Sequence, residues 1–124
     1  MLKDVDSSAI IATSDIERSL HFYADVLGLE LADTSLDHVL AFHTGSTRLI
    51  VYVSHEAGSN RANSAVWSCG DKFDAIIADL EAKGVEFDHY PDLGTVVGNV
   101  HLIGDAKGAW IKDPDGNILH LNSL

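Results

Sequence analysis

The sequence predicts an α+β fold built from two related halves, in which two helices lie behind two sheets. Two helix-like segments each begin at an aspartate and end at a glycine, and equivalent residues lie 56 positions apart (15 to 71 and 28 to 84). A run typical of a strand precedes each helix, at residues 9–13 and 65–69. Strand-like runs follow each glycine, so each half is predicted to run strand–helix–strand–strand–strand.

Length and composition predict one soluble globular domain that spans residues 1–124. Of the 124 residues, 46% are hydrophobic and 22% are charged, and a chain of this size buries roughly two-thirds of its unfolded surface. We expect a first module at about residues 6–55 and a second at about residues 62–124. The net charge of −11 disfavours nucleic acids and anionic membranes as partners, because like charges repel.

Cys69 is the only cysteine, so no disulfide can form within the chain. It follows an apolar run, which favours a buried structural thiol over a catalytic nucleophile. The longest apolar stretches, such as residues 49–53, are too short for a membrane span or a signal peptide. We therefore expect a cytoplasmic protein.

Capping residues and apolar spacing define both helices. Ser14 is expected to cap the first helix, with Glu17 completing a capping box, and Gly28 to end it. Asp71 is expected to cap the second helix and Gly84 to end it. Each helix carries an apolar stripe that should face the core, formed by Ile16, Leu20, Tyr23 and Leu27 in the first and by Phe73, Ile76, Ile77 and Leu80 in the second.

Two hairpins are predicted from pairs of strand-like runs around short turns. The paired runs are Val39–His43 with Arg48–Val53, and Ala109–Lys112 with Asn117–Leu121. The second turn is Asp113-Pro114-Asp115-Gly116, where proline and glycine suit a tight reversal. Residues 91–107 are expected to form a long loop with one short strand at 100–103, and the Gly94–Gly104 part either covers a cavity mouth or crosses the sheet edge.

Three segments resemble those of one protein family, in the order that the family has them: Ser14–Tyr23 leading into Val26–Glu30, then Asp79–Val85, then Trp110–Leu119. The chain resembles the vicinal oxygen chelate superfamily, which contains glyoxalase I, bleomycin-resistance proteins, fosfomycin-resistance enzymes and extradiol dioxygenases. The resemblance covers nearly the whole chain. It implies two βαβββ modules whose mixed sheets form a cup with the helices outside, a cavity within the cup, and a homodimer.

Enzymes of that superfamily usually hold a divalent metal through His, Glu or Gln on the first and last strand of each module. The resemblance places these four positions at Ser8, Ile50, Ser64 and His120. One imidazole cannot hold Zn²⁺, Ni²⁺ or Fe²⁺ tightly, because catalytic sites usually supply three protein ligands. We therefore expect no bound metal and no other cofactor.

The expected cavity wall follows from strand alternation. If Ile50 and His120 face the cavity, Arg48 and Tyr52 lie beside Ile50. The opposite face is then apolar and packs beneath the helices, through Leu49, Val51, Val53, Leu119 and Leu121. The candidate ligand-binding residues are Ser8, Arg48, Ile50, Tyr52, Ser64, Trp110 and His120.

Several of these side chains have two open interpretations. Arg48 either pairs with an anionic group of a ligand or forms a salt bridge at the sheet edge. Trp110 and Tyr52 either stack on a flat ring or pack in the core. His120 is either a catalytic acid or base, or a hydrogen-bonding residue of the wall.

The leading hypothesis is a metal-independent homodimer that binds or sequesters a small organic molecule in its cavity, as bleomycin-resistance-like members do. The ring-bearing wall favours an aromatic ligand, and the acidic surface weakly favours a cationic one. The alternative is an enzyme of the same superfamily, of the lyase, isomerase or dioxygenase type. It would use His120 as its acid or base, or a metal site at other positions than those above.

Overall fold

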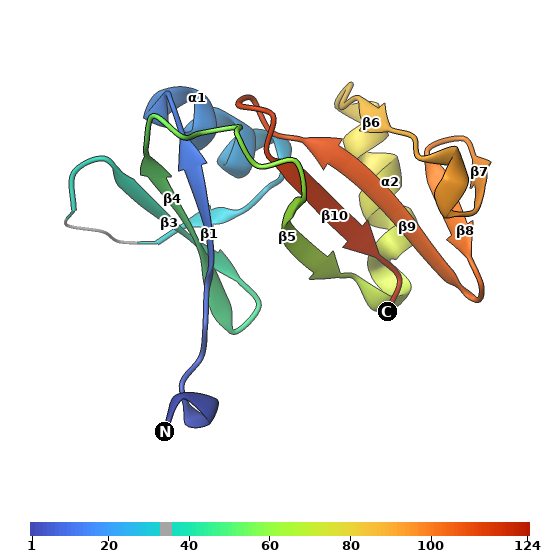
Figure 1. Cartoon of the computed structure of the whole chain (residues 1–124), viewed down its shortest axis with the longest axis horizontal. Coiled ribbons are helices and arrows are strands. Elements are labelled where there is room, and N and C mark those ends of the chain that lie inside the picture. Colours follow the sequence, from blue (N-terminus) through green and yellow to red (C-terminus); the bar gives the residue numbers. More distant parts are fainter. Residues whose placement is uncertain (33–35) are drawn as a thin grey trace.

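The computed structural model describes residues 1–32 and 36–124 and shows two sheets side by side, each with a helix behind it (Figure 1). The first sheet has the strand order β1-β4-β3-β2, and the second has the order β5-β10-β9-β8-β7, with β6 also paired to β9. The first strand of each half runs parallel to the last strand of that half. The α+β fold with two mixed sheets and outer helices is therefore confirmed.

Among its described residues, the first half contains four strands and the α-helix α1, which continues directly into a π-helical turn. Its elements are a 3-10 turn η1 (Leu2–Asp4), β1 (Ala9–Thr13), α1 (Ile16–Leu20), a π-helical turn η2 (His21–Val26), β2 (Glu30–Leu31), β3 (Val39–Thr44) and β4 (Thr47–Val53). The predicted hairpin around Gly45 is present as β3 and β4. Gly28 has a φ of 75°, as expected for the residue that ends the helix.

The second half contains six strands, which is more than predicted. Its elements are β5 (Asn63–Ser68), a 3-10 turn η3 (Gly70–Lys72), α2 (Phe73–Ala82), β6 (Phe87–Asp88), a 3-10 turn η4 (Pro91–Leu93), β7 (Thr95–Val97), β8 (Val100–Ile103), β9 (Ala106–Lys112) and β10 (Ile118–Asn122). The short strand predicted at residues 100–103 is present as β8. The segment predicted as a loop before it also holds β7, and the β7–β8 hairpin extends the sheet beyond β9. Gly98 forms its turn with a φ of 61°.

The predicted N-terminal caps of both helices were wrong. Asp15 caps α1, because its carboxylate accepts a hydrogen bond from the Arg18 amide at 3.2 Å. Ser14 instead donates its hydroxyl to Asp115 of the other half. Asp71 lies within the turn η3, and Lys72 precedes α2 without a side-chain capping bond.

The core lies between the sheets and the helices. Its most buried large side chains include Tyr23, Phe42, Phe73, Ile111 and Leu119. Leu49, Val51, Leu119 and Leu121 all pack on this side, as alternation predicts. Val53 does not, since 42% of its surface is exposed at the end of β4. Within the described residues, no helix has the length and apolar content needed to cross a membrane.

The β9–β10 turn joins the two halves. The Asp115 carboxylate accepts hydrogen bonds from the Thr13 hydroxyl at 2.9 Å and from the Ser14 amide at 3.1 Å, where β1 leads into α1. The Asn117 side-chain amide donates to the Ala12 carbonyl oxygen at 2.8 Å. These contacts fix the second sheet against the first strand of the first, beside the contacts between β1 and β5.

Candidate functional site

The face of each sheet that points away from the helices carries most of the predicted site residues. Ile10 pairs with Ile50, and Ala12 pairs with Tyr52, across the parallel strands β1 and β4. Their neighbours Leu49 and Val51 are fully buried under the helix, so Ile50 and Tyr52 lie on the helix-free face. Ser8 precedes β1 by one residue and is exposed.

In the second sheet, Trp110 and His120 stand directly opposite each other on β9 and β10. Their rings stack with centroids 4.4 Å apart and planes inclined by 23°. Trp110 is 6% exposed, whereas His120 is half-buried and covers one face of the indole. Both residues were predicted for the site individually, and the structure brings them together.

Asn63 contacts Trp110, and the sequence did not predict this contact. Its side-chain oxygen accepts a hydrogen bond from the Trp110 indole nitrogen at 3.1 Å. The pairing register of β5 against β10 shifts after Asn63, because Ile118 pairs with Asn63 while Leu119 pairs with Ala65. This bulge takes Ser64 out of the regular ladder, and strict alternation could not have revealed it.

Two further rings pack edge-on against Trp110. We call the four residues Tyr90, His101, Trp110 and His120 the aromatic cluster. His101 meets the Trp110 ring edge-on at 4.7 Å, and Tyr90 does so at 5.3 Å. His101 comes from β8 and Tyr90 from the approach to η4, both in or beside the segment predicted as a loop. No sequence pattern revealed the pairing of β8 with β9 that brings His101 to Trp110.

Gly108 makes room for the stacked rings. A Cβ atom at this position would lie 3.2 Å from Cε1 of His120 and 3.4 Å from two ring carbons of Trp110. Those distances are tighter than ordinary packing contacts, so a side chain at this position would have to displace one of the rings by a few tenths of an ångström. The stacking geometry therefore depends on the residue that lies between His101 and Asn122 in the sheet.

The hydrogen bonds of the two histidines assign their neutral tautomers. Nδ1 of His120 lies 3.1 Å from the carbonyl oxygen of Ala109, so it carries the proton and leaves the lone pair of Nε2 free. Nε2 of His101 accepts the Tyr90 amide at 2.8 Å. Burial lowers the pKa of His101, which keeps that ring neutral at physiological pH. In the tautomer that carries its proton on Nδ1, Nε2 of His120 offers a hydrogen-bond acceptor, or a base, on the helix-free face.

Arg48 and Ser64 lie apart from the aromatic cluster. Both line a groove of about 690 Å³ between the β3–β4 turn and β5. Arg48 is exposed, and in the described part of the chain it forms no ion pair with an acidic side chain. The predicted residues therefore divide between this groove, the first sheet and the aromatic cluster, and do not line a single enclosed cavity.

The four positions that the sequence resemblance assigns to metal ligands carry a poor set of donors. They hold Ser8, Ile50, Ser64 and His120, a set with a single good nitrogen ligand. Among residues 1–32 and 36–124, no three His, Cys, Asp or Glu side chains lie close enough together to hold a metal ion. The residues present therefore do not fit the divalent ion that the superfamily's enzymes use.

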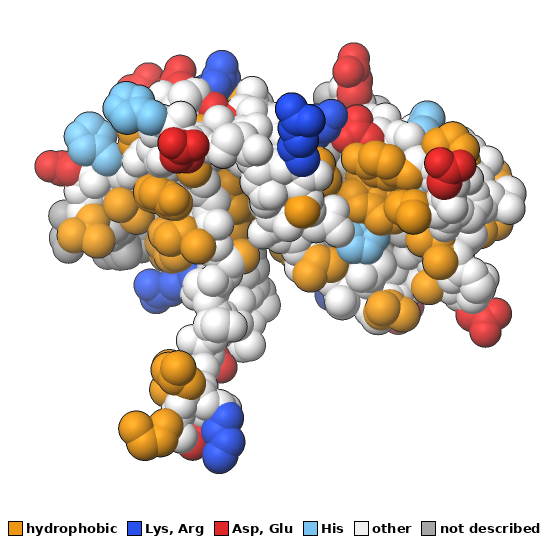
Figure 2. Space-filling view, viewed as in Figure 1, with side chains coloured by type: hydrophobic (Ala, Val, Ile, Leu, Met, Phe, Trp, Pro, Cys, Tyr) orange, Lys and Arg blue, Asp and Glu red, His pale blue; other side chains and the backbone are white. Residues whose placement is uncertain are grey.

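The helix-free face is rich in apolar side chains. Figure 2 shows hydrophobic side chains gathered over both halves, and over the second half they surround a histidine. Ile10 is 61% exposed and Val66 is 58% exposed, and Val66 pairs directly with His120. An apolar surface with a few polar groups is typical of a site that binds an organic molecule or a partner chain.

Several solved structures share this fold. The fold matches lactoylglutathione lyase from Agrobacterium tumefaciens with a TM-score of 0.71 and 20% identity, over 95% of this chain and 92% of that chain. It matches a glyoxalase/bleomycin resistance protein/dioxygenase from Alicyclobacillus acidocaldarius at 0.72 and 19%, over 98% and 93%. It matches the fosfomycin resistance protein of Listeria monocytogenes at 0.65 and 14%, over 96% and 90%.

At these identities the solved structures show a shared fold. No curated protein matches the sequence significantly. The family model for the Glyoxalase/Bleomycin resistance protein/Dioxygenase superfamily matches residues 7–121, which is nearly the whole chain. This match confirms the resemblance seen in the three sequence segments, and the chain belongs to this superfamily.

Proposed function

We propose that this protein binds a small, flat organic molecule on the helix-free face of the second sheet and does so without a metal ion. The observation that supports this is the stack of His120 on Trp110, with the exposed apolar Val66 beside it. An imidazole backed by an indole presents a flat, rigid surface on which an aromatic ring can stack. The lone pair of His120 Nε2 can accept one hydrogen bond from the ligand.

The exposed apolar residues favour a homodimer in which a second copy covers this face. Ile10, Val66 and Tyr52 leave a hydrophobic surface that a monomer would expose to water. Burying it against another chain would also enclose the ligand. We expect Val66→Asp to shift wild-type dimers toward monomers in sedimentation equilibrium, while Val97→Asp, at an exposed position in β7, leaves them unchanged. A wild-type protein that is monomeric at all concentrations would contradict this part.

Ligand binding is tested by thermal-shift screening with aromatic and cationic compounds, because a ligand that binds only the native state raises the melting temperature. We expect the affinity of the protein for a compound found in this screen to fall about tenfold or more in His120→Ala and in Trp110→Phe. His55→Ala serves as the matched control, since His55 is exposed in the connection between the two halves. Equal binding by His120→Ala and the wild type would overturn the proposed site.

Metal independence is tested by elemental analysis of dialysed protein together with the same ligand titration. We expect far less than one transition-metal ion per chain, and ligand affinity that a chelator does not change. A stoichiometric ion whose binding is lost in His120→Ala would contradict the proposal.

The free Nε2 of His120 also favours a second candidate function, a metal-independent lyase or isomerase that uses this nitrogen as its base. Under that alternative, His120→Gln retains ligand binding but loses turnover, because an amide accepts hydrogen bonds without taking up a proton. Under the binding hypothesis, no turnover accompanies binding in either protein.

A further inference from the structure

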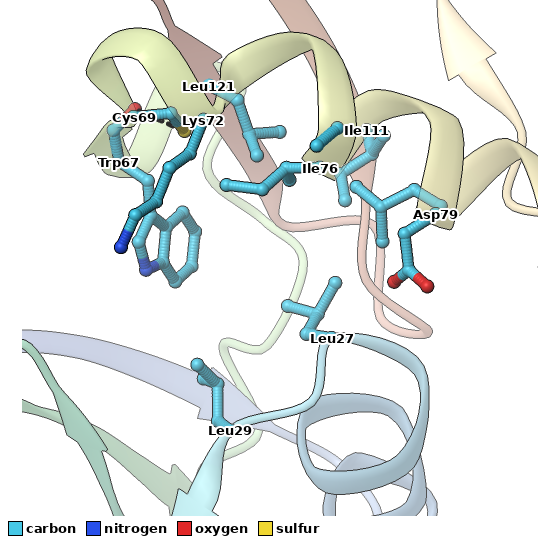
Figure 3. Close-up of a pocket in the computed structure, with 11 residues that line it drawn as sticks. Leu27, Leu29, Trp67, Cys69, Lys72, Ile76, Asp79, Ile111 and Leu121 are labelled. Carbon is cyan, nitrogen blue, oxygen red and sulfur yellow. Dashed lines mark hydrogen bonds between the residues drawn. The ribbon is translucent and has the colours of Figure 1, made fainter.

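A second cavity lies between the two halves on the helix side, behind the sheet that carries the aromatic cluster. It has a volume of about 430 Å³ and is lined mainly by apolar side chains. Leu27 and Leu29 of the first half point across it toward Ile76 of α2, and Trp67 and Lys72 stand together at one end (Figure 3). Its volume falls within the range of pockets that hold small organic molecules.

The cavity opens on the opposite side of the sheet from His120. Trp67 and Val66 are neighbours on β5 and point to opposite faces, and Val66 pairs with His120. Trp67 packs against the core on the helix side. The two tryptophans of the chain therefore report on different places: Trp67 lines this cavity and the adjoining groove that holds Arg48, whereas Trp110 belongs to the aromatic cluster.

The cavity has one free positive charge. Lys72 is exposed at its rim and, among the described residues, makes no ion pair or hydrogen bond through its ammonium group. Its ammonium group extends alongside the indole of Trp67 (Figure 3).

The only carboxylate in the lining is already paired. Asp79 lies 3.0 Å from Nζ of Lys83, which also donates to the carbonyl oxygen of Val26 at 2.9 Å. Cys69 adds no negative charge, because burial raises the pKa of its thiol. An apolar space with one unpaired ammonium group at its rim is complementary to an amphipathic anion.

We propose that this cavity binds a small aromatic monocarboxylate. The carboxylate lies at the Lys72 ammonium group, and the ring system lies among Trp67, Leu27 and Leu29. This cavity is separate from the aromatic cluster on the helix-free face. The proposal for the cavity does not depend on whether the aromatic cluster binds a ligand. It also couples the two halves, because Leu27 and Leu29 contact a ligand from one side and α2 from the other.

The test uses three probes of the same shape and different charge: naphthalene-2-carboxylate, naphthalene-2-methanol and naphthalen-2-ylmethylamine. Binding is followed through the two indole N–H signals in ¹H–¹⁵N spectra, assigned with Trp67→Phe and Trp110→Phe. We expect the carboxylate to shift the Trp67 signal saturably and to bind roughly threefold to tenfold more tightly than the alcohol, as for a partly exposed ion pair. The amine should bind most weakly.

Two variants with one positive charge fewer separate a local from a global effect. Lys72→Gln should remove the preference for the acid over the alcohol while the alcohol keeps its affinity. Lys3→Gln, in the distant η1 turn, should retain the preference. Ala75→Phe, from an exposed lining position of α2, should weaken all three probes by filling the cavity.

His120→Ala should leave the Trp67 response unchanged, which distinguishes this site from the proposed function. The proposal is overturned if the carboxylate shifts only the Trp110 signal or neither signal. It is also overturned if the acid and the alcohol bind the wild type equally, or if Lys72→Gln keeps the preference for the acid.

Discussion

The hydroxyl of Tyr23 donates a hydrogen bond of 2.6 Å to the buried carboxylate of Asp113 and so links the helical segment of one half to the β9–β10 turn of the other. The carboxylate also accepts the amides of Asp115 and Asn117 at 3.0 and 2.9 Å. Burial and the neighbouring Asp113 charge raise the pKa of Tyr23 far above its usual value, so the phenol remains a donor at every physiological pH. The relative position of the two halves therefore depends on a fully hydrogen-bonded buried acid.

Tyr23→Phe removes one donor from this carboxylate without leaving a large cavity. We expect the free energy of unfolding to fall by about 1–3 kcal/mol, because the buried Asp113 oxygen loses a partner. Urea denaturation measures the change. Tyr90→Phe is the matched control, since Tyr90 is less buried and lies outside this network. An unchanged stability in Tyr23→Phe would contradict the structural role given to the contact.

Asp115 predicts a specific loss of stability in acid. Burial acts to raise the pKa of Asp115, but the hydrogen bonds from Ser14 and Thr13 and the charge of Arg18 together lower it below its usual value. A carboxyl whose pKa is lowered on folding stabilises the protein above its unfolded pKa of about 4, and this contribution is lost as the pH falls through the folded value. Asp115→Asn should cost about 2 kcal/mol at pH 7, and the difference from wild type should shrink below pH 4. A difference that is constant from pH 7 to pH 3 would refute this.

Most of the fold could be predicted because local signals specify it. The apolar spacing of Phe73, Ile77 and Leu80 and the left-handed glycine at position 84 mark α2 and its end without tertiary information. The caps could not be predicted in the same way. Ser14 has a good capping side chain, but the other half supplies Asp115 as a partner, and this tertiary contact outweighs the local one.

The site was predicted less completely than the fold. The sequence predicted the hairpin and named both Trp110 and His120 as site residues, but not its register, in which Ile118 rather than Asn117 pairs with Lys112 and so brings the two rings opposite each other. A bulge in the β5–β10 pairing places Asn63 at the site, and the pairing of β8 with β9 in a glycine-rich segment places His101 there. Each depends on strand pairing across distant residues, which single-sequence patterns do not encode.

Gly58 is expected to be intolerant of substitution. Its φ is 75°, and a Cβ atom here would overlap the carbonyl oxygen of Asp115 in the turn that joins the halves. Gly58→Ala thus combines backbone strain with a clash against backbone that cannot move aside. We expect a loss of at least about 2 kcal/mol, measured by thermal unfolding. Gly45→Ala is the control, because its φ is also positive but the space around it is open; similar losses in both variants would argue against the clash.

Gly108→Ala tests the stacked rings on the helix-free face. The added methyl group must push His120 or Trp110 by a few tenths of an ångström, at a cost of about 1 kcal/mol. We expect the Trp110 indole N–H signal to move and affinity for the proposed flat ligand to fall, while the Trp67 signal stays in place. Near-ultraviolet circular dichroism gives a second measure of the altered stack. Unchanged Trp110 signals and affinity would show that the rings do not depend on this space.

His101 predicts a second loss of stability in acid, which arises from a buried base and not from a carboxylate. Burial lowers the pKa of His101 relative to the unfolded chain, so the unfolded state binds a proton first as the pH falls below about 6.5. Stability from this residue is complete above that pH and declines below it. His101→Gln retains an acceptor for the Tyr90 amide but cannot titrate. We therefore expect the wild type to lose more stability than this variant between pH 7.5 and pH 5.5 in urea titrations. The nearby His89 and His120 are present in both proteins, so parallel pH profiles would show that His101 is not held neutral by burial.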